Sequence, residues 1–318
     1  MLRFARRLST ASSLVATEVR ALQSLMVAQG HTSCDPTRRA GLHPLVVPVA
    51  STAAGDVLGL LRWPLQNDTL TVVRTRPQGS DISQESLSLI PCGTPSQYAR
   101  RAAVEADMAA ADGGPASGSI IAAAAEAAVE AGGIPYGAGD LEATRLGAAH
   151  FLLVRVGPFP DIWEQVTRKQ LDKGDETAAM VAAERASSLN PGWGCCVYHQ
   201  AQIMGTLGRT EEQRDLALSA LEAPFWTLGA PLDDALAAAQ LSHVEDLRAL
   251  VRAMEDKVRE QQNAPPRTVT ERALLRINDA LDEVVRNKGR WDDTRPVVAG
   301  ALREAGLEEA ACIADVQI

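Results

Sequence analysis

The sequence predicts an α+β protein that is mostly α, with a small antiparallel N-terminal sheet followed by stacked helical hairpins. Two observations carry this prediction. Residues 160–229 contain helix-forming segments separated by Gly174 and Gly208, which supply the backbone freedom of tight turns. Residues 45–92 contain short Val- and Thr-rich runs separated by turn residues, a pattern typical of antiparallel strands.

Length and composition narrow the class of protein. The chain has 318 residues, of which 46% are hydrophobic and 4% aromatic, so Ala, Leu and Val must fill the core of one or two domains. The formal net charge of -9 argues against a general binder of nucleic-acid backbones. No apolar run reaches the roughly 18 residues that a membrane span needs. We therefore expect no membrane span, and a nucleic-acid partner is disfavoured.

The N-terminus has the composition of an organelle transit peptide, which we assign to residues 1–28. Three arginines alternate with apolar residues at the start, hydroxyl residues follow, and no acidic residue precedes Glu18. The early arginines favour the mitochondrion, with the chloroplast as the alternative. Removal of the chain up to about Ser13 would take three positive charges with it. An ordinary exposed helix is the structural alternative for this segment.

The segment after the transit peptide, residues 29–44, mixes Gly, His, Ser, Pro and Arg without a period, and we interpret it as a linker or arm. The small β segment, residues 45–92, follows it. Pro48 implies an edge strand or an irregular start there. Strands are expected at residues 45–51, 56–64 and 69–77, with a further one at 86–90.

An α-helical domain is expected over residues 94–318, with two hairpins as its central part. Gly289 and Gly306 mark turns in its last block, which we interpret as a third, degenerate hairpin that caps the array. The hairpins are expected at residues 160–193 and 194–227, and other helices at 94–111, 119–131, 141–156, 232–240, 244–261, 270–287, 292–304 and from 307 to the end.

The spacing within the hairpins resembles the tetratricopeptide repeat, whose period is about 34 residues. The second unit departs from that pattern at Val197 and Gln213. The resemblance implies a concave face that binds peptides or other proteins. Any antiparallel helical bundle would also show Ala-rich faces and glycine turns, so a plain bundle is the alternative. The matching positions are Trp163, Gly174, Ala179, Ala186 and Pro191 in the first unit, and Gly208, Ala220 and, one residue early, Pro224 in the second.

A second resemblance concerns two segments, GLLRWP at residues 59–64 and GRTEEQRDLALSALEAPFWTLG at 208–229. They are similar to segments of a green-plant and algal family of organelle-targeted helical proteins without an assigned function. This resemblance supports an organelle address and adds no active-site residues.

No pattern in the sequence argues for catalysis. The five cysteines include no CxxC pair, and Cys195 with His199 would supply two of the four ligands that zinc usually takes. The chain lacks a GxSxG elbow and a Walker-type glycine loop, and the glycine pair at residues 137–139 lacks the third glycine of a dinucleotide fingerprint. We therefore expect no catalytic, cofactor or metal site, and no enzyme.

The candidate partner-binding residues are aromatic. Trp63 lies beside Arg62 at the tip of an expected strand, and a Trp–Arg pair can anchor a partner. Trp193, Tyr198 and Trp226 lie in or beside the second hairpin. Packing into the core is the alternative for Trp63 and for Trp226.

These observations favour a protein-protein interaction scaffold, an accessory subunit or assembly factor of an organellar complex, with other proteins as its partners. An RNA-associated helical-repeat protein of organelle gene expression is the alternative, although the acidic net charge opposes it. An enzyme with a non-standard site is a third reading, and a pocket that gathers His199, Cys195 and carboxylates would favour it.

Overall fold

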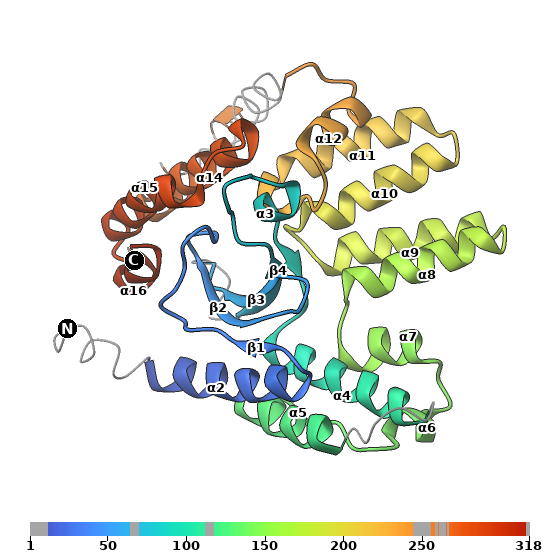
Figure 1. Cartoon of the computed structure of the whole chain (residues 1–318). Helices are drawn as coiled ribbons and strands as arrows, with labels where there is room; N and C mark the ends of the chain where they lie inside the picture. The colour runs from blue at the N-terminus through green and yellow to red at the C-terminus, as the bar shows by residue number, and fades with distance from the viewer. Residues whose placement is uncertain are drawn as a thin grey trace. The chain divides into compact units, whose positions relative to one another are not determined.

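The computed structural model describes residues 12–63, 70–111, 118–243, 256–257, 260, 265 and 267–315. Within these residues helices predominate, and five short strands form a sheet in the order β1-β2-β3-β4-β5 (Figure 1). The predicted fold class, mostly helical with a small antiparallel sheet near the N-terminus, is confirmed. The helix expected at 244–261 lies almost wholly outside the described residues.

The sheet confirms three of the four expected strands and adds a short one. Its first strand falls within the segment interpreted as a linker, and it runs antiparallel to the second, with Thr32 opposite Ser51. The strands are β1 (Thr32–Ser33), β2 (Val46–Ser51), β3 (Val57–Leu61), β4 (Thr71–Thr75) and β5 (Ile90–Pro91).

The strand expected at residues 86–90 is wrong for most of its length. Residues Gln84–Leu87 form the short helix α3, and strand β5 begins only at Ile90. The Ser86 hydroxyl donates a hydrogen bond to the carbonyl of Ser83 at 2.7 Å. Such local side-chain bonds offer the backbone an alternative to a strand ladder, and here they favour a helical turn.

The described residues form two compact units whose segments alternate along the chain. The first unit takes the residues up to 38, 47–74 and 91–159, and the second takes 39–46, 75–90 and 160 onward. Each unit is therefore assembled from three separate stretches of sequence. The two are described one at a time.

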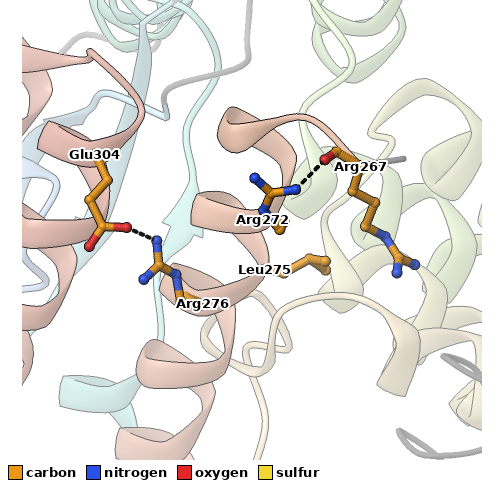
Figure 2. A pocket seen from close by; sticks show the side chains of 5 residues that line it. All are labelled: Arg267, Arg272, Leu275, Arg276 and Glu304. Atoms are coloured by element: carbon orange, nitrogen blue, oxygen red, sulfur yellow. Dashed lines mark hydrogen bonds and ion pairs between the residues drawn. The ribbon is translucent and has the colours of Figure 1, made fainter. Parts of the chain in front are cut away.

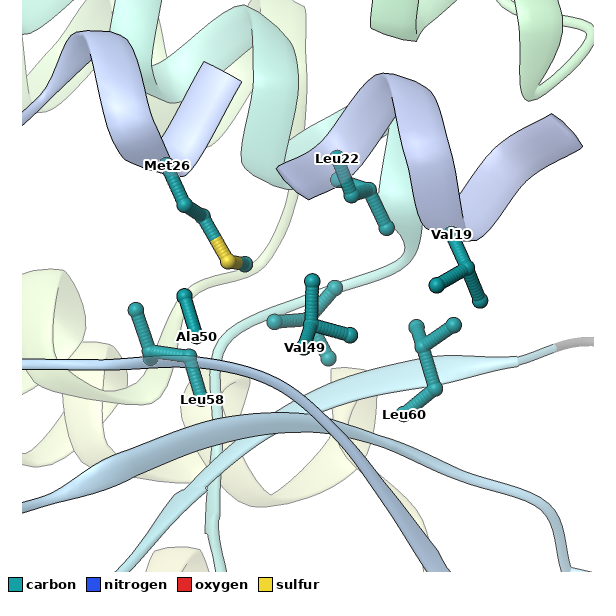
Figure 3. Packing of buried hydrophobic residues seen from close by; sticks show 8 residues of the cluster. Val19, Leu22, Met26, Val49, Ala50, Leu58 and Leu60 are labelled. Atoms are coloured by element: carbon teal, nitrogen blue, oxygen red, sulfur yellow. The ribbon is translucent and has the colours of Figure 1, made fainter. Parts of the chain in front are cut away.

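The first unit is organised around helix α2 (Ser12–Ala28), which packs on the sheet. Val19, Leu22 and Met26 follow one another at helical spacing, and all three are buried. Figure 3 shows their side chains pointing toward those of the strands. The cluster consists of Val19, Leu22, Met26, Val49, Ala50, Leu58, Leu60 and Val72.

The described part of the first unit contains five further helical segments. They are α4 (Pro95–Ala111), α5 (Gly118–Glu130), α6 (Asp140–Thr144), α7 (Ala148–Phe151) and the π-helix η1 (Leu152–Val156). Helix α5 contacts both α2 and α4, and its alanines at 124, 127 and 128 are buried. The helix expected at 141–156 is confirmed as helical but is divided, because Arg145 has a left-handed backbone that ends α6.

The second unit contains both expected helical hairpins, drawn from green to yellow in Figure 1. They are α8 (Pro160–Asp172) with α9 (Glu176–Leu189), and α10 (Gly194–Thr206) with α11 (Thr210–Glu222). Each helix packs on the next. Gly174 and Gly208 have positive φ at the two turns, and Ala179, Ala186 and Ala220 are buried as the spacing predicts. Membership of the tetratricopeptide family stays a prediction.

The second unit continues with the 3-10 helix η2 (Phe225–Thr227), α12 (Leu232–Ala238), α14 (Val269–Asn287), α15 (Trp291–Glu304) and α16 (Glu308–Ala314). Helix α14 packs on α15, and α15 packs on α16. The Phe225 amide donates to the buried carboxylate of Asp282 at 2.7 Å, which ties η2 to α14. The C-terminal helices thus belong to the same core as the hairpins.

Two buried arginines hold residues 39–46 against the C-terminal helices. Arg295 of α15 donates to the carbonyls of Arg39 at 2.6 Å and Leu42 at 2.8 Å. Arg39 in turn donates to the carbonyl of Ile313 at 2.7 Å. Asp292 lies 2.9 Å from Arg295 and balances its charge. A buried cation is tolerated when its donors are satisfied in this way.

Gln78 joins residues 75–90, the other short stretch of the second unit, to residues 39–46 and to helix α15. Its amide donates to the carbonyl of Gly41 at 2.8 Å, and its side chain accepts from the Trp291 amide at 2.9 Å. Trp291 is 1% exposed, and its indole donates to the carbonyl of Ser86 at 2.8 Å. Gly41 has φ +69, and a Cβ there would lie 2.5 Å from the Gln78 carbonyl oxygen. No other residue type fits at that position.

Replacing Leu22 with alanine tests the packing of α2 on the sheet. Leu22 is 1% exposed, so its loss removes buried apolar surface and leaves a cavity. We expect the free energy of unfolding to fall by about 2–5 kcal/mol, measured by chemical denaturation. The matched control is Val27→Ala on the same helix, because Val27 is 50% exposed and should change stability little. Equal effects of the two substitutions would contradict the packing.

Candidate interaction surface

Three of the four aromatic residues expected to bind a partner lie inside the second unit. Trp193 is 8% exposed, Tyr198 6% and Trp226 3%. The rings of Trp193 and Trp226 meet edge to face, with centroids 6.0 Å apart. A partner would have to open the core to reach these rings. The position of Trp226 matches the alternative that it packs into the core. Trp63 is half-buried just after strand β3.

The interior of the second unit also encloses a histidine. The ring of His43 lies 4.9 Å from that of Trp226 and 5.0 Å from that of Trp291, measured between centroids. Its Nδ1 accepts from the Leu45 amide at 3.3 Å. Burial, with a smaller effect from the charge of Arg295, lowers the pKa of His43 to about 3. The imidazole is therefore neutral at neutral pH and serves as a packing group.

Helix α10 places Cys195 and His199 one turn apart. The Sγ atoms of Cys195 and Cys196 are 4.0 Å apart. Burial, followed by the charge of Arg168, lowers the pKa of His199. Within the described part of the chain, no group of three or more His, Cys, Asp and Glu side chains could hold a metal ion.

A surface pocket lies along the N-terminal half of α14, with a volume of about 700 Å³ (Figure 2). Thr268 and Glu271 form a capping box that fixes the start of this helix. Arg272 and Arg276 are one turn apart and so share a face. Glu304 comes from the end of α15, which packs on α14. The lining residues are Arg267, Arg272, Leu275, Arg276 and Glu304.

The pocket is positively charged within an acidic chain. Three guanidinium groups face one carboxylate in its lining, whereas the whole chain carries a net charge of -9. Arg276 forms an ion pair with Glu304, which lowers the pKa of the carboxyl group and raises that of the guanidinium. Arg272 donates to the carbonyl of Arg267 at 2.7 Å, and Arg267 lies 2.6 Å from Asp256. The guanidinium groups are thus oriented before any ligand binds.

Sequence reasoning did not identify this pocket. It predicted the helix at 270–287, and the i,i+4 spacing of Arg272 and Arg276 was a usable signal for a charged face. Glu304, however, belongs to the next helix, and no periodicity shows which residue of that helix faces Arg276.

Within the described chain, no helix is both long enough and apolar enough to cross a membrane.

The fold and this pocket define a mostly helical protein with two stacked hairpins and a positively charged surface pocket. Residues 5–155 match the family model described as PAB N-terminal, and residues 160–245 match that of the PAB middle domain. The two matches cover about three quarters of the chain, in the order that their names give. The junction between them falls at the start of α8, where the long C-terminal stretch of the second unit begins.

A curated relative matches over nearly the whole chain. The chloroplastic protein "IN CHLOROPLAST ATPASE BIOGENESIS" of Arabidopsis thaliana is 28% identical over 298 residues, which cover 90% of this chain and 82% of the relative. No solved structure matches the chain. The charged pocket lies C-terminal to both PAB matches.

The buried histidine makes the stability of the second unit pH-dependent. The pKa of His43 is about 3 in the folded protein against an ordinary value of 6.5, so below pH 6.5 the unfolded chain binds a proton that the folded chain resists. Stability should therefore fall as the pH drops from about 6.5 toward 3. His43→Leu should reduce this slope in denaturation measured across the range.

His243→Gln is the matched control, because His243 is exposed in the same unit. It should leave the slope unchanged. An identical pH dependence in wild type and His43→Leu would contradict the assignment.

Proposed function

We propose that the protein is a non-catalytic assembly factor that acts in the biogenesis of the chloroplast ATPase. The observation that carries this proposal is the alignment with the Arabidopsis protein over 90% of this chain. An alignment of that extent takes in most of both units, so it favours a shared role of the whole molecule rather than one borrowed domain.

The physical properties of the chain fit a role in binding proteins. Helices that stack side by side, as α8 to α11 do, offer long faces to a partner. The acidic net charge disfavours the RNA-associated alternative, since binding a phosphate backbone draws on clustered basic residues. The pocket on α14 is basic, but one of its walls is a carboxylate. The proposal includes a scaffold and an accessory subunit, since both would bind other proteins of the complex.

The proposed compartment is the chloroplast rather than the mitochondrion. The name of the relative places that protein in the chloroplast. The arginine-rich N-terminus predicts import into an organelle and by itself favours the mitochondrion, whereas the name of the relative supports the chloroplast alternative.

We infer that the transit peptide is shorter than the 1–28 assigned from the sequence. Cleavage after residue 28 would remove α2 and uncover the sheet residues on which it packs. Sequencing the N-terminus of the protein purified from its own organelle should give a mature end before Val19. A mature end after Met26 would overturn the inference, because the buried side chains of α2 would then be missing.

Disruption of the gene in its own organism tests the proposed function. Assembled chloroplast ATPase should fall severalfold on native gels, while the transcripts of its subunits stay level and another chloroplast complex is unchanged. Reintroducing the wild-type gene should restore the ATPase. Normal ATPase levels without the protein would sink the proposal, and a loss of subunit transcripts would favour the RNA-associated role instead.

A native pull-down from organelle extract gives an independent measurement. Partners that survive high salt and nuclease treatment support a protein-binding assembly factor. Loss of every partner on nuclease treatment alone would contradict it.

A further inference from the structure

The pocket on α14 presents the features of a site for carboxylates. Arg272 and Arg276 project from one helical face, and Figure 2 shows Leu275 between the flanking arginines. Arginine presents a planar fork of donors that matches the two oxygens of a carboxylate. Leu275 is half-buried and adds an apolar surface beside these forks. Together they fit a ligand that alternates carboxylates with apolar side chains.

We propose that this pocket binds an acidic segment of a protein partner, with carboxylates on Arg272 and Arg276 and an apolar side chain on Leu275. The inference deepens the proposed function and rests on it, because it names the chemistry by which an assembly factor would hold a protein partner.

Glu304 is a carboxylate of the protein itself that already occupies part of this site. Its carboxylate already pairs with Arg276, although it comes from a different helix. The side chains of Arg276 and Glu304 are 51% and 59% exposed, so water screens the pair and its strength is modest. A carboxylate of a partner can therefore replace that of Glu304 at little cost, and Glu304 acts as an internal competitor for the site.

Leu275 favours a peptide over a nucleic acid. A nucleic-acid strand carries a charge at every phosphate, and the Glu304 carboxylate and the net charge of -9 oppose any densely charged anion. A peptide places its carboxylates at separate positions and can set an apolar residue against Leu275.

Binding of short peptides to the purified full chain tests the proposal. The peptides have equal length and leucine content, and their net charge runs from strongly negative, with glutamates, to strongly positive, with lysines. The wild-type protein should bind more tightly as the peptide becomes more acidic, and this preference should weaken with added salt. A single-stranded oligonucleotide of similar charge is the competing probe.

Three variants make the test specific to the pocket. R272Q/R276Q should weaken binding of the acidic peptide about tenfold, as expected when two exposed charge-assisted contacts are lost. E304Q should strengthen it about threefold, because it removes the competing carboxylate. R209Q/R214Q removes the same charge from exposed side chains at the N-cap of α11 and within that helix, and should leave the affinity within about twofold of wild type.

The opposite signs expected of R272Q/R276Q and E304Q separate the pocket from a general loss of folding. Equal affinity of wild type and R272Q/R276Q for the acidic peptide would overturn the inference, as would tighter binding of the oligonucleotide than of the peptide. If the pocket variants do not change peptide binding but gene loss still lowers the level of assembled ATPase, only this inference is rejected. Normal ATPase after gene loss would reject the proposed function, whatever the peptides show.

Discussion

The second unit depends on the way in which a few buried polar groups satisfy one another. Arg295, Gln78 and the Trp291 indole are all withdrawn from water. Arg295 donates to a carbonyl of residues 39–46 and the Trp291 indole to one of residues 75–90, while the Gln78 side chain accepts from the Trp291 amide. A buried donor without an acceptor costs about 1–3 kcal/mol, so these segments have one favourable position and little freedom to shift. Apolar packing alone would not fix their register so closely.

The elements that could be predicted from the sequence are those with local causes. The helices at 270–287 and 292–304 follow from periodic apolar residues, and the hairpins follow from glycine turns, because both signals lie within one stretch of chain. Helix α3 was missed because serine side chains, not apolar period, decide the backbone there. The alternation of two units along the chain has no local signal at all. The bond between Arg39 and Ile313 joins residues 274 positions apart.

The candidate site also combines features that have a local sequence signal with features that have none. Trp193 and Trp226 were candidate partner-binding residues, with core packing as the alternative for Trp226, and both are buried. With only 4% aromatic residues, the chain uses these large rings to fill the interior. The segment after α11 folds back so that the Trp226 carbonyl accepts from the Leu89 amide at 2.8 Å, a contact that spacing cannot reveal. The pocket on α14 was missed for a related reason, since Arg276 and Glu304 lie 28 positions apart on separate helices. Their residue types are visible in the sequence, and their pairing is a property of the fold.

The alternation of the two units bears on when the protein can fold. Synthesis delivers the N-terminal end first, yet residues 39–46 find their partners only when the last helices have been made. The late closure of such distant contacts makes folding slower than for a chain of independent repeats. An incomplete chain would leave a buried arginine, a histidine and the tryptophan-lined interior exposed to solvent. Chaperones and proteases that recognise such exposed groups would then distinguish a finished copy from a truncated one.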